Sequence, residues 1–158
     1  MQSFKKLVHH SETLLPLQQL QAMPQAVMVG SVFKLGCSLA QNYALVHVVD
    51  DFVSFAACLQ QGGLQPASIR QFASFQGLIP SPALCLVDTP QFLRQMRVLR
   101  SVWTEFARHY AVPREGYQRR VAGYLLERLH SHLLCQGLLD GSLPSVGIGH
   151  RFVVLGNA

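Results

Sequence analysis

The chain has 158 residues, of which 49 % are hydrophobic and only 13 % are charged. That length favours one domain, residues 1–158, with a core of its own. Charged residues make up about a quarter of an average soluble domain, so we expect part of this surface to be covered in a homo-oligomer, by a partner subunit or against a membrane. No apolar run approaches the roughly 18 residues of a membrane-spanning helix. The first ten residues lack a signal peptide's apolar stretch, so a cytoplasmic location is expected.

The net charge is +5 with neutral histidines. Basic residues are dispersed except between Arg94 and Arg120, and no basic run alternates with aromatic residues, so no nucleic-acid partner is expected. Attraction to anionic substrates or to lipid headgroups at the inner face of a membrane fits this charge. The four cysteines form no Cys-x-x-Cys pair, which gives no support to a zinc or redox motif and predicts buried thiols.

In chain order, the first half predicts short helices around one strand. Residues 11–20 read as a helix and residues 26–30 as a buried strand between Pro24 and Gly30. Ser38 is expected to cap a helix that runs through His47. Asp50 is expected to cap the next helix, which Gly62 and Gly63 end.

The second half predicts longer helices. Residues 66–75 form a short helix, residues 80–82 a turn, and residues 83–87 a second buried strand. A long helix follows to about Tyr110, with an inward face of Phe92, Met96, Leu99, Val102, Trp103 and Phe106. Its exposed face carries Arg94, Arg97, Arg100 and Arg108.

The tail reads as a loop over 141–149 and a last strand over 151–155. The pattern as a whole predicts an α+β fold that is predominantly helical. A small sheet, built from the runs near Ala26, Ala83 and Phe152, is covered by the long helices.

The stretch from about Glu115 to Gln136 organises the chain. Its apolar face is made by Val121, Tyr124, Leu125, Leu129 and His132, which lie three or four residues apart. Glu127 lies among Arg119, Arg120 and Arg128, close to Gly123, a residue small enough to admit another backbone. Two interpretations stay open: a core helix with a solvated charged edge, or a helix that lines a polar pocket.

A second cluster runs from Tyr43 to Asp51. His47 follows Tyr43 by four residues, and Asp50 and Asp51 stand at the junction of two helices. Such a group can accept a proton or help to hold a divalent cation with a substrate phosphate. The alternative is that His47 is a core histidine and the two carboxylates only serve the start of a helix.

Three stretches together resemble a bacterial family of capsular and exopolysaccharide glycosyltransferases. Tyr117-Gln-Arg-Arg-Val-Ala-Gly-Tyr-Leu-Leu-Glu-Arg-Leu129 is similar to the family's closing helix, roughly Arg-Val-x-Gly-Phe-Leu-x-Glu-Arg-Leu. Residues 38–51 resemble its Ser-Val-x-x-x-Tyr-x-x-x-His-x-x-Glu-Asp segment, and residues 78–110 resemble the strand and long helix between them. The likeness spans about residues 17–139.

The resemblance implies a GT-A-like fold and transfer of a sugar, such as galactose or galactofuranose, from a nucleotide donor to a glycan acceptor. By position it singles out eight residues, Tyr43, His47, Asp50, Asp51, Arg120, Gly123, Glu127 and Arg128. Asp51 or His47 would be the base, and Arg120 and Arg128 would face phosphate or hold Glu127. A divalent cation accompanying the sugar nucleotide is left open, and no metal ligand is assigned.

The sequence differs from the family's pattern in the half that binds the nucleotide donor. The nucleotide-binding strand and helix that open family members are not found, and the Asn expected before Ala83 is absent. The resemblance therefore covers the acceptor-side half. Two alternatives stay open: a partner subunit supplies the donor-binding half, or the chain is a non-catalytic interaction module. The helix from Arg94 to Arg108 is a weaker candidate for peripheral membrane contact.

Glu127 is expected to be partly buried and held by a charge-assisted hydrogen bond.

Overall fold

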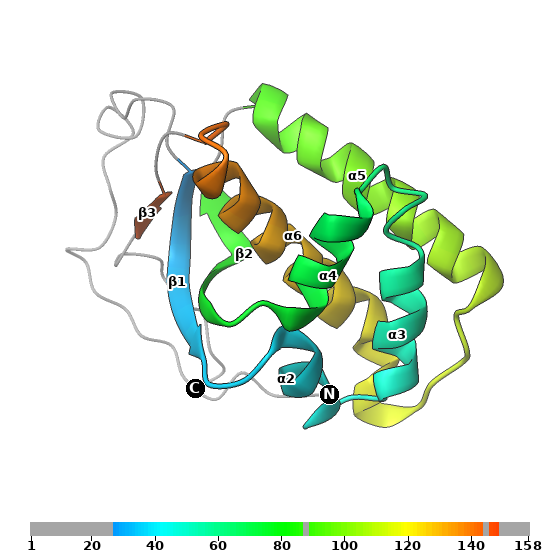
Figure 1. Cartoon of the computed structure of the whole chain (residues 1–158). Coiled ribbons are helices and arrows are strands. Elements are labelled where there is room, and N and C mark those ends of the chain that lie inside the picture. Colours follow the sequence, from blue (N-terminus) through cyan, green and yellow to red (C-terminus); the bar gives the residue numbers. More distant parts are fainter. Residues whose placement is uncertain (1–26, 87–88, 144–145, 149–158) are drawn as a thin grey trace, which may run out of the picture.

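The structure is a computed structural model that describes residues 27–86, 89–143 and 146–148. Helices make up most of this part, and a small sheet lies on one side of them (Figure 1). The elements are β1 (Val27–Leu35), α2 (Leu39–Ala44), α3 (Val49–Ala57), α4 (Pro66–Ser74), β2 (Gly77–Leu86), α5 (Thr89–His109), the 3-10 helix η2 (Gly116–Arg120), α6 (Val121–Leu139) and β3 (Val146–Ile148). The predicted α+β class with mostly helix is confirmed; the helix expected over 11–20 lies outside the described residues.

The sheet has the strand order β2-β1-β3, with β1 antiparallel to β2 and parallel to β3. The turn predicted at 80–82 is wrong, because Pro80 lies inside β2, opposite Val32. Among the described strands β2 is at the edge, where a missing backbone donor can be tolerated. The loop predicted over 141–149 contains β3, and the strand predicted near Phe152 lies outside the described residues.

Helix α6 joins the sheet to the other helices. It packs against β2 on one side and against α5 on the other, while α3 contacts both α5 and α6 (Figure 1). Leu125 and Leu129 of α6 are fully buried, as their spacing predicted. The core they enter includes Leu39, Tyr43, Phe52, Phe55, Leu59, Phe72, Val102 and Phe106.

The two helices after β1 meet at a corner, and their ends differ from the prediction. Ser38 caps α2 in a capping box with Gln41, as expected for the cap, but α2 ends at Ala44, three residues before His47. The prediction that Asp50 caps α3 is wrong, since Val48 holds that position without a side-chain bond. Asp50 lies in the first turn, where a carboxylate still complements the helix dipole.

Helix α5 has the predicted length and the predicted exposed arginines. Leu99, Val102 and Phe106 face inward, but Phe92 is 40 % exposed and was wrongly assigned to the core. Gln91 and Gln95 are buried on that face instead, which the apolar pattern could not predict.

The organising stretch is a 3-10 turn, η2, followed by α6, rather than one continuous α-helix. No other backbone in the described part of the chain approaches Gly123. A Cβ added at Gly123 would meet no atom within 4 Å among the described residues.

Candidate functional site

A cavity of about 450 Å³ lies where β1 and β2, the corner between α2 and α3, and the η2–α6 segment meet. Its lining combines aromatic, charged and hydroxyl side chains. This mixture is typical of a ligand-binding cavity rather than of a packing gap between apolar elements. The lining residues are Phe33, Lys34, Leu35, Asn42, Val46, His47, Ile79, Pro80, Tyr117, Tyr124, Glu127, Arg128 and Ser131.

His47 stands in the connection from α2 to α3 and is 8 % exposed. Its ring stacks on Tyr124, with 4.0 Å between ring centroids, and lies nearly parallel to Tyr117 at 5.5 Å. Tyr43, four residues earlier, contacts it at 4.6 Å. Three tyrosine rings therefore fix the plane of the imidazole at the wall of the cavity.

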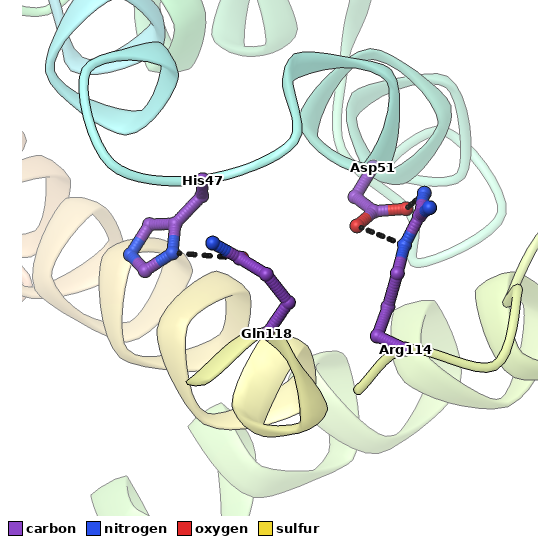
Figure 2. A network of polar contacts seen from close by, with 4 residues as sticks. All are labelled: His47, Asp51, Arg114 and Gln118. Carbon is purple, nitrogen blue, oxygen red and sulfur yellow. Dashed lines mark hydrogen bonds and ion pairs between the residues drawn. The ribbon is translucent and has the colours of Figure 1, made fainter. Parts of the chain in front are cut away.

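The side chain of Gln118 sets the orientation of this imidazole. Its Nε2 donates to the backbone oxygen of Val46 at 2.9 Å, and its Oε1 lies 3.2 Å from Nδ1 of His47. The amide oxygen can only accept, so we assign the proton of neutral His47 to Nδ1. The other ring nitrogen, Nε2, then carries a lone pair and points away from Gln118 (Figure 2).

Burial lowers the pKa of His47 from its usual 6.5, and the nearby charge of Arg128 lowers it further. The hydrogen bond to Gln118 works in the opposite direction and offsets part of this pKa shift. The imidazole is accordingly neutral at pH 7, the form in which Nε2 can take a proton.

Arg128 is held beside the cavity by neutral groups. Its guanidinium donates to the backbone oxygen of Tyr124 and to Oδ1 of Asn42, each at 3.1 Å, and lies 5.1 Å from the centre of the Tyr43 ring. Burial lowers the pKa of Arg128, and the neighbouring charge of Glu127 counteracts this shift. The site thus presents a fixed positive charge with little water around it.

Tyr43 lies behind His47 and is fully buried. Burial, followed by the charge of Asp51, raises the pKa of its phenol to about 12. Tyr43 therefore supports the ring of His47 and does not itself line the cavity.

Glu127 lines the cavity and is half-buried, so the prediction of partial burial is confirmed. Its backbone oxygen accepts from Oγ of Ser131, one turn later, at 2.9 Å. The charge-assisted hydrogen bond that we expect for its carboxylate stays a prediction.

Asp51 lies outside the cavity. Its carboxylate accepts two hydrogen bonds from Arg114, at 2.8 Å from one guanidinium nitrogen and 3.2 Å from Nε, and is 4 % exposed (Figure 2). This bond raises the pKa of Arg114. A carboxylate enclosed in a bidentate ion pair is poorly placed to accept a substrate proton.

The structure therefore brings together His47, Glu127 and Arg128 from the residues that the sequence singled out. Asp50 and Arg120 are both exposed, and neither lines the cavity. Cζ of Arg120 lies 5.3 Å from the centre of the Tyr124 ring. The sequence pattern did not predict Gln118, Arg114 and Asn42 as partners of His47, Asp51 and Arg128, or Lys34 as a residue of the lining. No sequence signal marks these four residues. None belongs to a recognisable motif, and the contacts that Gln118, Arg114 and Asn42 make join segments far apart in the chain.

Two further features concern only the described part of the chain. It contains no group of three His, Cys, Asp or Glu side chains arranged to hold a metal ion. None of its helices has the length and apolar character needed to cross a membrane.

Comparisons with known protein families, with curated proteins and with solved structures find no match for this chain. The likeness to capsular glycosyltransferases consequently rests on the three sequence stretches alone.

Proposed function

We propose that the cavity binds a sugar and that the protein is related to the glycosyltransferases of capsule, exopolysaccharide or O-antigen synthesis. The observation that carries the proposal is the meeting of His47, Glu127 and Arg128 at one cavity. These three positions are also marked by the resemblance, although they come from segments about 80 residues apart. The described elements would then form the acceptor side of a GT-A-like enzyme.

The lining suits a sugar ring in its chemistry. Tyr117 is 47 % exposed at the cavity and offers an aromatic face to the apolar face of a sugar. Glu127 and the hydroxyl oxygen of Ser131 offer acceptors to sugar hydroxyl groups, and Arg128 offers donors. Lys34, exposed on β1, adds a second positive charge for an anionic part of the ligand.

The mechanism that fits this geometry is direct transfer with His47 as the base. Nε2 of His47 takes the proton of an acceptor hydroxyl while that oxygen attacks the anomeric carbon of the donor. The bond from the anomeric carbon to the nucleoside diphosphate breaks, and the diphosphate leaves with the electron pair. Arg128 and Lys34 stabilise the negative charge of the leaving diphosphate. Asp51 takes no part in proton transfer and stabilises the fold through its ion pair with Arg114.

The donor-binding half belongs, in this proposal, to a partner subunit. A divalent cation bound with the sugar nucleotide would be held on that donor side, and we assign it no ligand among the described residues.

Calorimetric titration with UDP-galactose and UDP-galactofuranose, alone and with a galactose-containing acceptor, tests the proposal. The parent is expected to bind the acceptor alone and the sugar nucleotide once the donor-side partner is present. Acceptor binding is expected to fall at least tenfold in Arg128→Gln, which removes about 1.4 kcal/mol or more of charged hydrogen bonding. Arg119→Gln is the matched control, since Arg119 is exposed and outside the lining. Equal loss in both variants, or no binding with a donor-side partner present, contradicts the proposal.

A second candidate, a non-catalytic interaction module, is favoured by an apolar patch at the corner of α2 and α3. Leu45, Val46, Val49 and Val53 are between 44 % and 75 % exposed there. Exposed apolar side chains grouped in this way are typical of a surface that meets another protein, including a second copy of the chain. Sedimentation of Val53→Asp beside the parent tests it: a shift from oligomer to monomer supports the module, and a parent that is already monomeric contradicts self-association.

A further inference from the structure

The outer face of α5 carries a stripe of positive charge, with one acidic residue, Glu105, beside it. Leu93, Arg97, Arg100, Thr104 and Arg108 follow one another at intervals of three or four residues and are all exposed. The buried residues of α5, such as Val102 and Phe106, lie on the opposite side and face α3 and α6. In Figure 1 helix α5 runs along one edge of the molecule.

The single acidic residue of α5 is Glu105. Its carboxylate lies 3.6 Å from Nε2 of His109, one turn later. Among the described residues neither Arg97 nor Arg100 forms an ion pair. The two guanidinium groups are therefore available to an anion from outside the chain.

Between these arginines lies a shallow hollow of about 490 Å³. Gln61, Arg97, Arg100, Ser101, Thr104 and Glu105 line it. Oγ of Ser101 donates to the backbone oxygen of Gln61 at 3.3 Å, which ties the hollow to the turn after α3. Two guanidinium groups with the hydroxyl of Thr104 beside them suit a phosphate, and their two positive charges exceed the one negative charge of Glu105 in the same lining.

Apolar side chains extend the same surface at its N-terminal end. Phe92 is 40 % and Leu93 is 47 % exposed, and Leu93 lies one turn before Arg97. The stripe from Leu93 to Arg108 is about 22 Å long at the rise of an α-helix. A straight basic stripe with exposed Phe and Leu at one end suits a flat anionic surface rather than a small soluble ion.

We propose that the outer face of α5 docks on an anionic lipid bilayer, with a headgroup phosphate in the hollow between Arg97 and Arg100. Leu93 and Phe92 enter the headgroup region, and the arginines lie over the phosphates. This surface is separate from the cavity at His47, so the proposal stands whether or not that cavity binds a sugar.

Vesicle flotation of the full chain tests the docking. Phosphatidylcholine vesicles with and without phosphatidylglycerol are the two probes, and binding is expected only with the anionic lipid and is expected to weaken with salt. Removing an arginine near such a surface costs about fivefold in partitioning, so Arg97→Gln with Arg100→Gln should lower binding about 25-fold. Arg70→Gln with Arg119→Gln is the matched control, because both side chains are exposed elsewhere and the net charge changes equally.

Three results overturn the proposal: no binding to anionic vesicles at low salt, equal binding to neutral vesicles, or equal losses in the two double variants. Inorganic phosphate distinguishes a soluble ligand from the bilayer. If phosphate at low concentration releases all bound protein, the hollow is an ion site and the bilayer is not its occupant.

A fluorescence measurement tests the orientation independently. In a Trp103→Phe background, which removes the only tryptophan, Leu93→Trp should shift its emission to the blue on anionic vesicles. An unchanged spectrum in a bound protein places Leu93 in water and overturns the proposed orientation.

Discussion

Gln118 holds His47 in one tautomer: Oε1 of the amide lies 3.2 Å from Nδ1 of the ring, and Nε2 of the amide is committed to the backbone oxygen of Val46. The two side chains are 71 residues apart, yet this contact decides which nitrogen of neutral His47 carries the proton. It gives the neutral imidazole a defined lone pair at Nε2, and it makes Gln118 a positioning residue for any proton transfer at the site.

Replacing Gln118 tests that relationship. Gln118→Ala should let the His47 proton redistribute between the two nitrogens, and it should lower the pKa of His47 further because the hydrogen bond that raises it is lost. Long-range nitrogen–proton NMR of the imidazole reports both changes. Gln136→Ala, on a half-buried glutamine elsewhere in α6, is the control. An unchanged tautomer in Gln118→Ala would show that the amide does not direct the ring.

The ion pair of Asp51 and Arg114 should be structural. Asp51→Asn removes the charge from a carboxylate that is 4 % exposed and leaves Arg114 without its partner, so the melting temperature should fall by several degrees. Asp50→Asn, one residue earlier and exposed, should change it little. Equal melting temperatures for both variants would mean that the pair contributes nothing, and Asp51 would return as a candidate base.

Stability should fall as the pH drops from 6.5 toward 4. Burial lowers the pKa of His130 and His132 to about 4 each, against 6.5 in the unfolded chain. Between these values the unfolded state binds more protons, so the contribution is complete above pH 6.5 and is lost below it. The loss approaches about 3 kcal/mol for each histidine.

Denaturant melts across this pH range measure the effect. In His132→Leu the slope of unfolding free energy against pH should be reduced, because the ring it removes is fully buried against Phe72 and Phe75. His109→Ala, at an exposed position, should keep the parent slope. A parent whose stability is flat from pH 6.5 to 4.5 would contradict buried neutral histidines.

Two glycines should respond to alanine in opposite directions. At Gly123, exposed within α6, a Cβ meets no described atom within 4 Å, so Gly123→Ala should stabilise by about 1 kcal/mol through helix propensity. At Gly62 a Cβ would lie 2.3 Å from Cγ2 of buried Val102, so Gly62→Ala should destabilise by about 1–3 kcal/mol. Thermal melts compare the two, and a destabilised Gly123→Ala would imply a contact that the described residues do not show.

Glu127 is half-exposed at the cavity, so its removal should cost less than the roughly 3 kcal/mol that a fully buried pair would give. We expect about 1 kcal/mol or less in Glu127→Ala, and less again in Glu127→Gln, which keeps one acceptor. Ligand binding should suffer more than stability in both variants. A loss of stability near 3 kcal/mol would place the carboxylate in a fully buried pair.

Local patterns predicted the elements well and their ends less well. Ser38 carries a capping box that can be read from Ser38 and Gln41, and the spacing of Leu125 and Leu129 predicted the buried face of α6. Pro80 wrongly predicted a turn, since proline is typical of turns and only the edge position of β2 lets it stay in a strand. Asp50 wrongly predicted a helix cap, because cap and first-turn positions favour the same side chains.

The partners of the site could not be predicted in the same way. Arg114 meets Asp51 across 63 residues, and Asn42 meets Arg128 across 86. Contacts of this kind depend on how α2, α3 and η2 pack together, which periodicity and capping rules do not determine. A single glutamine or arginine in a loop carries no local signal of its partner.

The most direct test of the central claim is to watch the imidazole of His47 by NMR while a galactose-containing oligosaccharide is added. The account predicts that the His47 signals shift in a saturable manner, that the shift disappears in Arg128→Gln, and that it persists in Arg119→Gln. His47 signals that stay unchanged throughout the titration would contradict a sugar site in this cavity.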